Sequence, residues 1–212
     1  MSFHNCDFLI GIGIDDDGTT LTQSVIRRTP GRGSGWPGGA VVTLERLKAP
    51  ADLVPAIDRY FPKIDRGDEW DRSAAFVFDC TSFVHGRALL EAWNRCRTRR
   101  LGIPADFLAV TQEENRSRVR GIGRVPWGQL LEVLALLRRR DSLKVAALPL
   151  AAELEQQIAG SRQRPLRADQ DGYSGTDLFR VVALSAFRAH VGAASTGGVI
   201  EVRWTAPAGS AA

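Results

Sequence analysis

The feature that most constrains the fold is a short apolar segment that ends on an acidic residue and leads into a helical pattern. Residues 74–78 (AAFVF) are an apolar and aromatic run, which predicts a buried strand. Asp79 follows, then the small residues Thr81 and Ser82, then apolar residues at helical spacing up to Trp93. Open α/β sheets bind ligands at this end of a strand, and a buried carboxylate there needs a partner or a metal. Asp79 is therefore either a functional acid or a cap for the turn that follows it.

A three-stranded antiparallel meander is predicted at the start of the chain. The first strand is residues 8–14 (FLIGIGI), and residues 15–18 (DDDG) carry the Asp-Gly signal of a hairpin turn. Residues 19–28, rich in Thr, Val and Ile, form the returning strand, and residues 40–47 (AVVTLERL) form the third. The glycine-rich loop 30–39 separates the last two strands.

After this meander, helical patterns alternate with short strands. Further helices are expected at residues 51–61, 127–139, 150–158 and 177–191. A fifth strand is expected at residues 106–110 and a short extended piece at 143–146. Loops are expected at residues 95–104, 111–124 and 159–172. The order β-β-β-α-β-α-β-α predicts an α/β fold with one mixed sheet, as in the ribonuclease H-like fold: the meander joins parallel strands, and helices flank the sheet.

Most of the length is expected to form one domain. A chain of 212 residues can bury a core without disulfides. Residues 1–193 are assigned to the ribonuclease H-like domain. Residues 194–212 are assigned to a C-terminal extension, with an edge-strand pattern at 199–204 (VIEVRW) and a disordered tail after it.

The composition excludes several classes of protein. Three widely spaced cysteines argue against a disulfide framework and favour a reducing, cytoplasmic compartment. No apolar run is long enough to cross a bilayer, so no membrane association is expected. The Gly-Lys-Ser/Thr signature of a phosphate-binding loop does not occur, so the chain is not expected to be an ATPase.

The net charge of +4 is carried mainly by arginine, which is clustered at residues 95–100, 116–124 and 138–140. Guanidinium groups suit phosphate, and basic clusters indicate nucleic-acid binding. The alternative interpretation is that these clusters are solvated loops and helix ends. The residues expected to contact DNA are Arg116, Arg118, Arg120 and Arg124.

Three groups of motifs, in this order, resemble the nuclease domain of phage terminase large subunits, in the short form found in prophages. The first is the strand ending at residues 79–82 (DCTS), with residues 86–90 (GRALL) after it. The second is residues 124–127 (RVPW) with the leucine-rich helix behind them, then residues 143–145 (LKV). The third is residues 175–178 (GTDL), leading into residues 182–184 (VAL). The resemblance extends over residues 8–191.

The resemblance implies metal-dependent cleavage of phosphodiester bonds. In this family, three or four carboxylates hold two Mg²⁺ or Mn²⁺ ions about 4 Å apart, one to activate water and one to stabilise the leaving oxygen. Asp79 matches the middle ligand and Asp177 the late one, although Asp177 would serve equally as a helix N-cap. One of Asp15, Asp16 and Asp17 is the candidate for the remaining ligand, with Asp15 and Asp17 named as metal ligands, and the alternative for all three is an ordinary solvated hairpin tip.

The sequence also departs from the family pattern. Gly11 stands where the first acid of the family is expected, and Thr176 replaces one acid of a pair. Two hypotheses follow. The chain is either a metal-dependent DNA endonuclease of phage or prophage DNA processing, or a catalytically degenerate DNA-binding or assembly module. Another ribonuclease H-like enzyme, such as a junction resolvase, is a further option. The resemblance implies DNA as partner, together with a separate ATPase motor or portal-type phage component, in the cytoplasm of a bacterial host.

Overall fold

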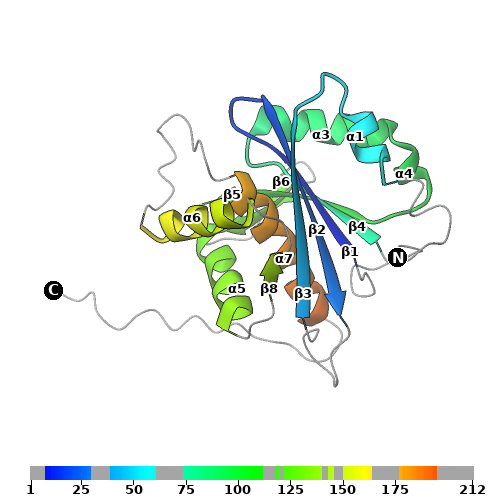
Figure 1. Ribbon diagram of the computed structural model, residues 1–212. Helices are drawn as coiled ribbons and strands as arrows, with labels where there is room; N and C mark the ends of the chain where they lie inside the picture. Colours follow the sequence, from blue (N-terminus) through cyan, green and yellow to red (C-terminus); the bar gives the residue numbers. More distant parts are fainter. Residues whose placement is uncertain are drawn as a thin grey trace.

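A computed structural model gives the structure of the chain at residues 8–29, 39–60, 74–111, 118–119, 122–139, 143–145, 150–163 and 177–194. Its architecture is α/β: one mixed sheet with helices on both faces (Figure 1). The strands are β1 (Phe8–Ile14), β2 (Thr20–Thr29), β3 (Gly39–Lys48), β4 (Ala74–Asp79), β5 (Ala105–Thr111), β6 (Arg118–Val119), β7 (Ile122–Pro126) and β8 (Leu143–Val145). The helices are α1 (Val54–Asp58), α3 (Phe83–Arg95), α4 (Arg97–Arg100), α5 (Trp127–Arg139), α6 (Leu150–Gln163) and α7 (Asp177–Ala194).

The sheet has the order β6-β7-β5-β4-β1-β2-β3-β8 in the part of the chain that the structure describes. Strands β1, β2 and β3 form the predicted antiparallel meander. On the other side of β1, the pairs β1–β4, β4–β5 and β5–β7 are all parallel. The carboxyl ends of β1, β4, β5 and β7 therefore share one edge of the sheet, which is where α/β sheets bind ligands.

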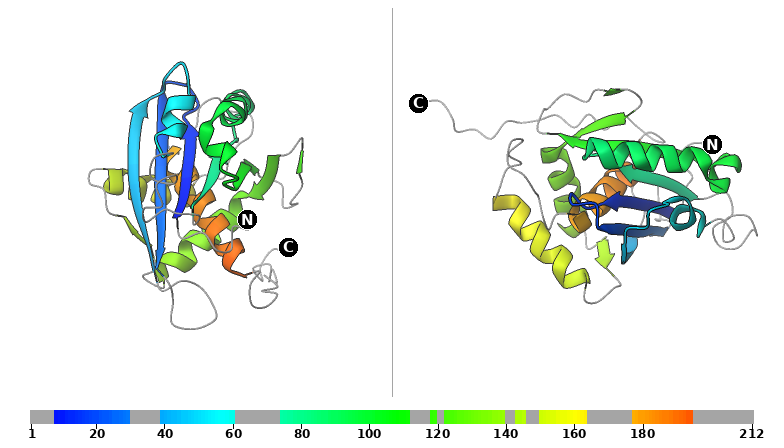
Figure 2. Two further views of the ribbon diagram at one scale, coloured as in Figure 1. Left: turned by 90° about the vertical axis from the view of Figure 1, so that its right-hand side faces the viewer. Right: turned by 90° about the horizontal axis from the view of Figure 1, so that it is seen from above.

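Helices cover the two faces of the sheet in two separate layers, as the view from above in Figure 2 shows. Helices α1, α3 and α4 lie on one face, and α5, α6 and α7 on the other. Strand β4 contributes to both cores, because successive side chains point to opposite faces. Phe76 and Phe78 stack on each other and make tilted ring contacts with Trp93 of α3, whereas Ala75 and Val77 lie in the core beneath α7. Burial on both faces explains the uninterrupted apolar sequence of β4.

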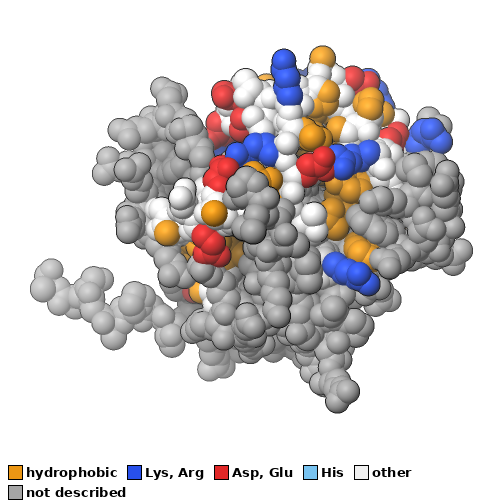
Figure 3. Space-filling model, viewed as in Figure 1, with side chains coloured by type: hydrophobic (Ala, Val, Ile, Leu, Met, Phe, Trp, Pro, Cys, Tyr) orange, Lys and Arg blue, Asp and Glu red, His pale blue; other side chains and the backbone are white. Residues whose placement is uncertain are grey.

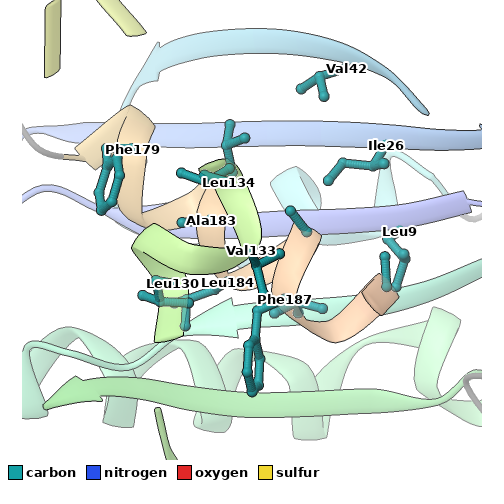
Figure 4. Close-up of a cluster of buried hydrophobic side chains, with 14 of the residues drawn as sticks. Leu9, Ile26, Val42, Leu130, Val133, Leu134, Phe179, Ala183, Leu184 and Phe187 are labelled. Carbon is teal, nitrogen blue, oxygen red and sulfur yellow. The ribbon is translucent and has the colours of Figure 1, made fainter. Parts of the chain in front are cut away.

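Helix α7 is enclosed by protein on several sides. It packs on β1, β2 and β4, and α5 and α6 pack on it in turn. Residues 178–187 are all buried, which is the pattern of a helix in the interior rather than at a surface. Figure 4 shows this core, in which Phe179, Ala183, Leu184 and Phe187 of α7 form one cluster with Leu130, Val133 and Leu134 of α5 and the strand residues Leu9, Ile26 and Val42.

Several sequence-based boundaries need correction. The segment 111–124, predicted as a loop, contains β6 and the start of β7, and the predicted turn at 95–104 contains the one-turn helix α4. Helix α6 continues to Gln163, beyond its predicted end, and α1 is shorter than expected. The predicted extension 194–212, with its edge strand at 199–204, lies outside the described residues apart from Ala194. Among the helices that the structure describes, none has the length and apolar character needed to cross a membrane.

Candidate functional site

The candidate site lies at the edge where β1 and β4 end. Three segments meet there: the β1–β2 turn at residues 15–18, the end of β4 at Asp79, and the first turn of α7. Ile12 of β1 pairs with Phe78 of β4, so the β1–β2 turn begins beside Asp79. The sequence motif that ends on Asp79 therefore lies at the edge formed by the carboxyl ends of the parallel strands, which is where α/β sheets commonly bind ligands.

The carboxylate of Asp79 is buried and has partners on both oxygens. Its side chain is 3% exposed. Oδ1 accepts hydrogen bonds from the backbone N–H of Thr81 at 2.9 Å and from the Thr81 hydroxyl at 2.5 Å. Thr81 Oγ1 in turn accepts a hydrogen bond from the backbone N–H of Val110 in β5 at 3.1 Å. Asp79 thus caps the turn after β4, in agreement with one of its two interpretations, and its carboxylate is oriented by the adjacent strand.

The second oxygen of Asp79 binds an arginine that is not among the residues expected from the sequence. Arg180 Nε donates to Asp79 Oδ2 at 3.0 Å, and the Arg180 side chain is only 3% exposed. Its two terminal nitrogens donate to Asp16, Nη1 to Oδ2 at 3.2 Å and Nη2 to Oδ1 at 3.0 Å. One guanidinium therefore bridges a buried carboxylate of β4 and a carboxylate of the β1–β2 turn.

Burial by itself lowers the pKa of the Arg180 guanidinium, but the negative charges and hydrogen bonds of Asp79 and Asp16 raise the pKa overall. The side chain therefore stays positively charged at any ordinary pH. A signal for it exists in the sequence: Arg180 is the one charged residue in the apolar segment 178–187 (LFRVVALSAF). A charge inside such a segment needs an acidic partner, although the sequence does not say which.

The other acids of the β1–β2 turn stabilise the turn itself. Asp15 Oδ1 accepts a hydrogen bond from the backbone N–H of Thr20 at 2.9 Å, and Asp17 Oδ1 accepts one from the backbone N–H of Thr19 at 2.8 Å. Hydrogen bonds from the side chain and the backbone of Thr19 lower the pKa of the exposed Asp17 carboxyl. The Asp17–Thr19 bond has the spacing of an Asx turn, whereas the Asp15–Thr20 bond closes the hairpin between the two strands.

Two glycines allow α7 to come close enough to β1 for Arg180 to reach the edge. A Cβ atom on Gly11 would lie 2.3 Å from Ser185 Oγ, and one on Gly13 would lie 2.5 Å from Val181 Cγ2. Gly11 is the position where the family resemblance puts the first acid, and the helix leaves no space for a side chain there. The β1 position that adjoins Asp79 is Gly13, where an added Cβ would lie 3.2 Å from Asp79 Cβ.

The remaining predicted site residues are only partly described. Asp177 is the first residue of α7, three positions before Arg180, and its side chain lies outside the described residues, as does all of Thr176. Of the four arginines expected to contact DNA, Arg116 and Arg120 also lie outside them. Arg118 pairs through its backbone with Gly123, and Arg124 is a half-buried residue of β7.

Many arginines in the described part of the chain have acidic partners. Besides those of Arg180, the ion pairs among the described residues include Arg46–Glu153, Arg59–Glu45, Arg87–Glu91, Arg95–Asp52 and Arg188–Asp106. Figure 3 shows the result on one face of the molecule, where basic and acidic side chains of the described residues lie interspersed. Pairing reduces the contribution of these arginines to any binding of phosphate.

The donor set at this edge differs from the two-ion centre that the resemblance implies. Such a centre needs several carboxylate oxygens directed at divalent cations. Here Asp79 directs one oxygen at Thr81 and the other at Arg180, while Asp16 directs both at Arg180. A guanidinium thus lies between the carboxylates, and as they stand the described side chains do not fit two divalent ions. No cluster of three or more His, Cys, Asp or Glu side chains suited to a metal occurs among the described residues.

Neither a protein-family model nor a curated protein sequence matches this chain. The likeness to terminase nuclease domains therefore depends on the residues and motifs quoted above.

Proposed function

We propose that this chain is a ribonuclease H-like module of phage or prophage DNA processing that acts by binding or assembly and does not cut DNA. The general architecture supports the fold part of the proposal. An antiparallel meander leads into parallel strands, Asp79 ends the strand beside β1, and a late helix crosses the same region of the sheet. These elements have the order expected for a ribonuclease H-like domain.

The observation that carries the functional part is the bridge from Arg180 to Asp79 and Asp16. A two-metal nuclease needs positive charge from ions that exchange with solvent and bind phosphate oxygens. In this chain the positive charge comes from a side chain that is 3% exposed and is anchored in a buried helix. Arg180 therefore supplies charge compensation for the two carboxylates without supplying a Lewis acid or a water molecule.

The second candidate function is the metal-dependent endonuclease. Its support is the position of Asp79 and of Asp15 and Asp17 at one edge of the sheet, together with Asp177 at the start of α7. In that function Asp79, Asp177 and one acid of the β1–β2 turn would hold Mg²⁺ or Mn²⁺. The guanidinium of Arg180 would first have to leave the space between the carboxylates.

Plasmid cleavage distinguishes the two functions. The purified protein and its Asp79→Asn variant are incubated with supercoiled plasmid and Mn²⁺, and with Mg²⁺ in a parallel series. We expect no divalent-dependent nicking from either protein. Nicking by the parent chain that is lost in Asp79→Asn would refute the proposal and establish the endonuclease. Circular dichroism of the variant serves as the control that the fold is retained.

A binding assay on the same samples separates the two forms of the proposed module. Binding to duplex DNA that weakens steeply as salt is raised would indicate contacts with phosphates. The absence of binding over the same range would favour an assembly role with a protein partner, such as an ATPase motor or portal-type component.

A further inference from the structure

We infer that the guanidinium of Arg180 takes the place of a divalent cation at this edge of the sheet, so that removing its charge turns Asp16 and Asp79 into a divalent-cation site. This inference rests on the proposed function, because it assumes that the native chain uses the arginine and not a metal. It goes further in assigning a ligand class to the two carboxylates.

The first argument is the convergence of two carboxylates on one positive centre. Asp79 comes from the end of β4 and Asp16 from the β1–β2 turn, and three nitrogens of one side chain bind them at 3.0–3.2 Å. The protein therefore already brings together acidic oxygens from segments far apart in sequence. Oxygens of this type are the ligands that Mg²⁺, Mn²⁺ and Ca²⁺ prefer.

The second argument is that the folded protein is strongly destabilised if the carboxylate of Asp79 has no positively charged partner. A carboxylate that is 3% exposed has lost most of its contact with water, and an unpaired charge in such a place is strongly unfavourable. Its Oδ1 is fixed by the N–H and hydroxyl of Thr81, which keeps Oδ2 directed at the position of the guanidinium. Without Arg180, a cation at that position would restore the lost compensation.

The third argument concerns access. The Asp16 side chain is 28% exposed, so the outer end of the bridge is open to solvent whereas the Asp79 end is closed. A side chain as small as alanine at residue 180 would leave the volume of a guanidinium between the two carboxylates. An ion entering past Asp16 could keep part of its hydration shell, as Mg²⁺ and Mn²⁺ commonly do.

The test compares four proteins by thermal unfolding: the parent chain, Arg180→Ala, Arg180→Lys, and the double variant Asp79→Asn/Arg180→Ala. Each is measured with Mn²⁺, with Mg²⁺, and with potassium salt at matched ionic strength. We expect the Tm of Arg180→Ala to rise by roughly 5–10 °C once the divalent ion is about 100-fold above its dissociation constant. The parent, Arg180→Lys and the double variant should show no rise beyond the potassium control.

Each other outcome overturns the inference. An Arg180→Ala protein that responds to divalent ions no more than the parent does, or a double variant that responds as strongly as the single one, would show that the two carboxylates form no such site. If Arg180→Ala does not fold alone, refolding yield with and without Mn²⁺ replaces Tm. If Arg180→Ala then refolds neither with nor without Mn²⁺, while the double variant folds, the inference is refuted. If the Tm of neither the parent nor Arg180→Ala responds to divalent ions, this inference alone is refuted. If the Tm of the parent rises with divalent ions and the parent also nicks plasmid, the proposed function is refuted as well.

Discussion

Breaking the bridge between Arg180 and Asp79 should destabilise the protein more than any surface ion pair does. Removing one partner of a buried pair costs about 3–5 kcal/mol, because an uncompensated charge is left behind. Both side chains here are 3% exposed, which places the pair in the buried class. The two hydrogen bonds from Thr81 to Asp79 would remain, and Asp16 would return partly to water. We therefore expect Arg180→Met to cost about 3–4 kcal/mol, toward the lower end of that range.

The double variant Asp79→Asn/Arg180→Met tests the reason for that cost. An asparagine oxygen can still accept the hydrogen bonds from Thr81, and neither residue 79 nor residue 180 would then carry a charge. Replacing both members of a buried pair is often close to neutral. We expect the double variant to be more stable than Arg180→Met alone, with a coupling energy of about 2 kcal/mol between the two positions.

Urea unfolding of the four members of this cycle provides the measurement, with circular dichroism and the fluorescence of the buried Trp93 and Trp127 as independent probes. The matched control is Arg87→Met, which removes an ion pair with Glu91 whose side chains are 71% and 62% exposed. That variant should lose less than about 1 kcal/mol. A cost below about 1 kcal/mol for Arg180→Met, or strictly additive effects of the two substitutions, would refute the argument from burial.

Two further predictions concern packing and pH. Gly13→Ala should destabilise the protein by about 1–3 kcal/mol, because the new Cβ would lie 2.5 Å from Val181 Cγ2. Gly160→Ala in α6 places its Cβ where nothing lies within 4 Å, so it should stabilise the protein by about 1 kcal/mol. Thermal unfolding that ranks the two variants the other way would contradict the close approach of α7 to β1. Burial raises the pKa of the Cys80 thiol from 9.0 to about 12 and, against the nearby guanidinium of Arg59, raises that of the Tyr60 phenol from 10.0 to about 12. Both groups stay neutral to a higher pH in the folded state than in the unfolded state. Their contribution to the free energy of unfolding is therefore complete below pH 9 and is lost as pH rises toward 12. A urea midpoint that stays constant between pH 8 and 11 would be inconsistent with this.

The sequence predicts the centre of the fold well and its margins poorly. Strands β1 and β4 are apolar without interruption because both of their faces are buried, and such runs are visible without any structure. Strands β6 and β7 were missed because residues 118–126 combine arginines and glycines with few apolar side chains. Their extended conformation depends on pairing with each other and with β5, which is a tertiary contact that no local pattern reports.

The same division holds for the site. The position of Asp79 follows from a strand that ends on an acid and precedes a helix, so a local pattern is sufficient to find it. The ion pair between Asp79 and Arg180 depends on how α7 is placed over β1. That placement is possible because Gly11 and Gly13 have no side chains. Residues 101 positions apart cannot be paired from one sequence, because each has several acceptable partners until the packing is known.

The place of α7 in the chain has a consequence for biosynthesis. This helix fills the groove between the sheet and helices α5 and α6, yet it is the last element of the described chain to leave the ribosome. Until it emerges, the apolar faces of β1, β2, β4 and α5 lack the cover that α7 provides. A nascent chain that ends before residue 177 is therefore expected to be prone to aggregation and dependent on chaperones, and the core can be completed only after α7 has been synthesised.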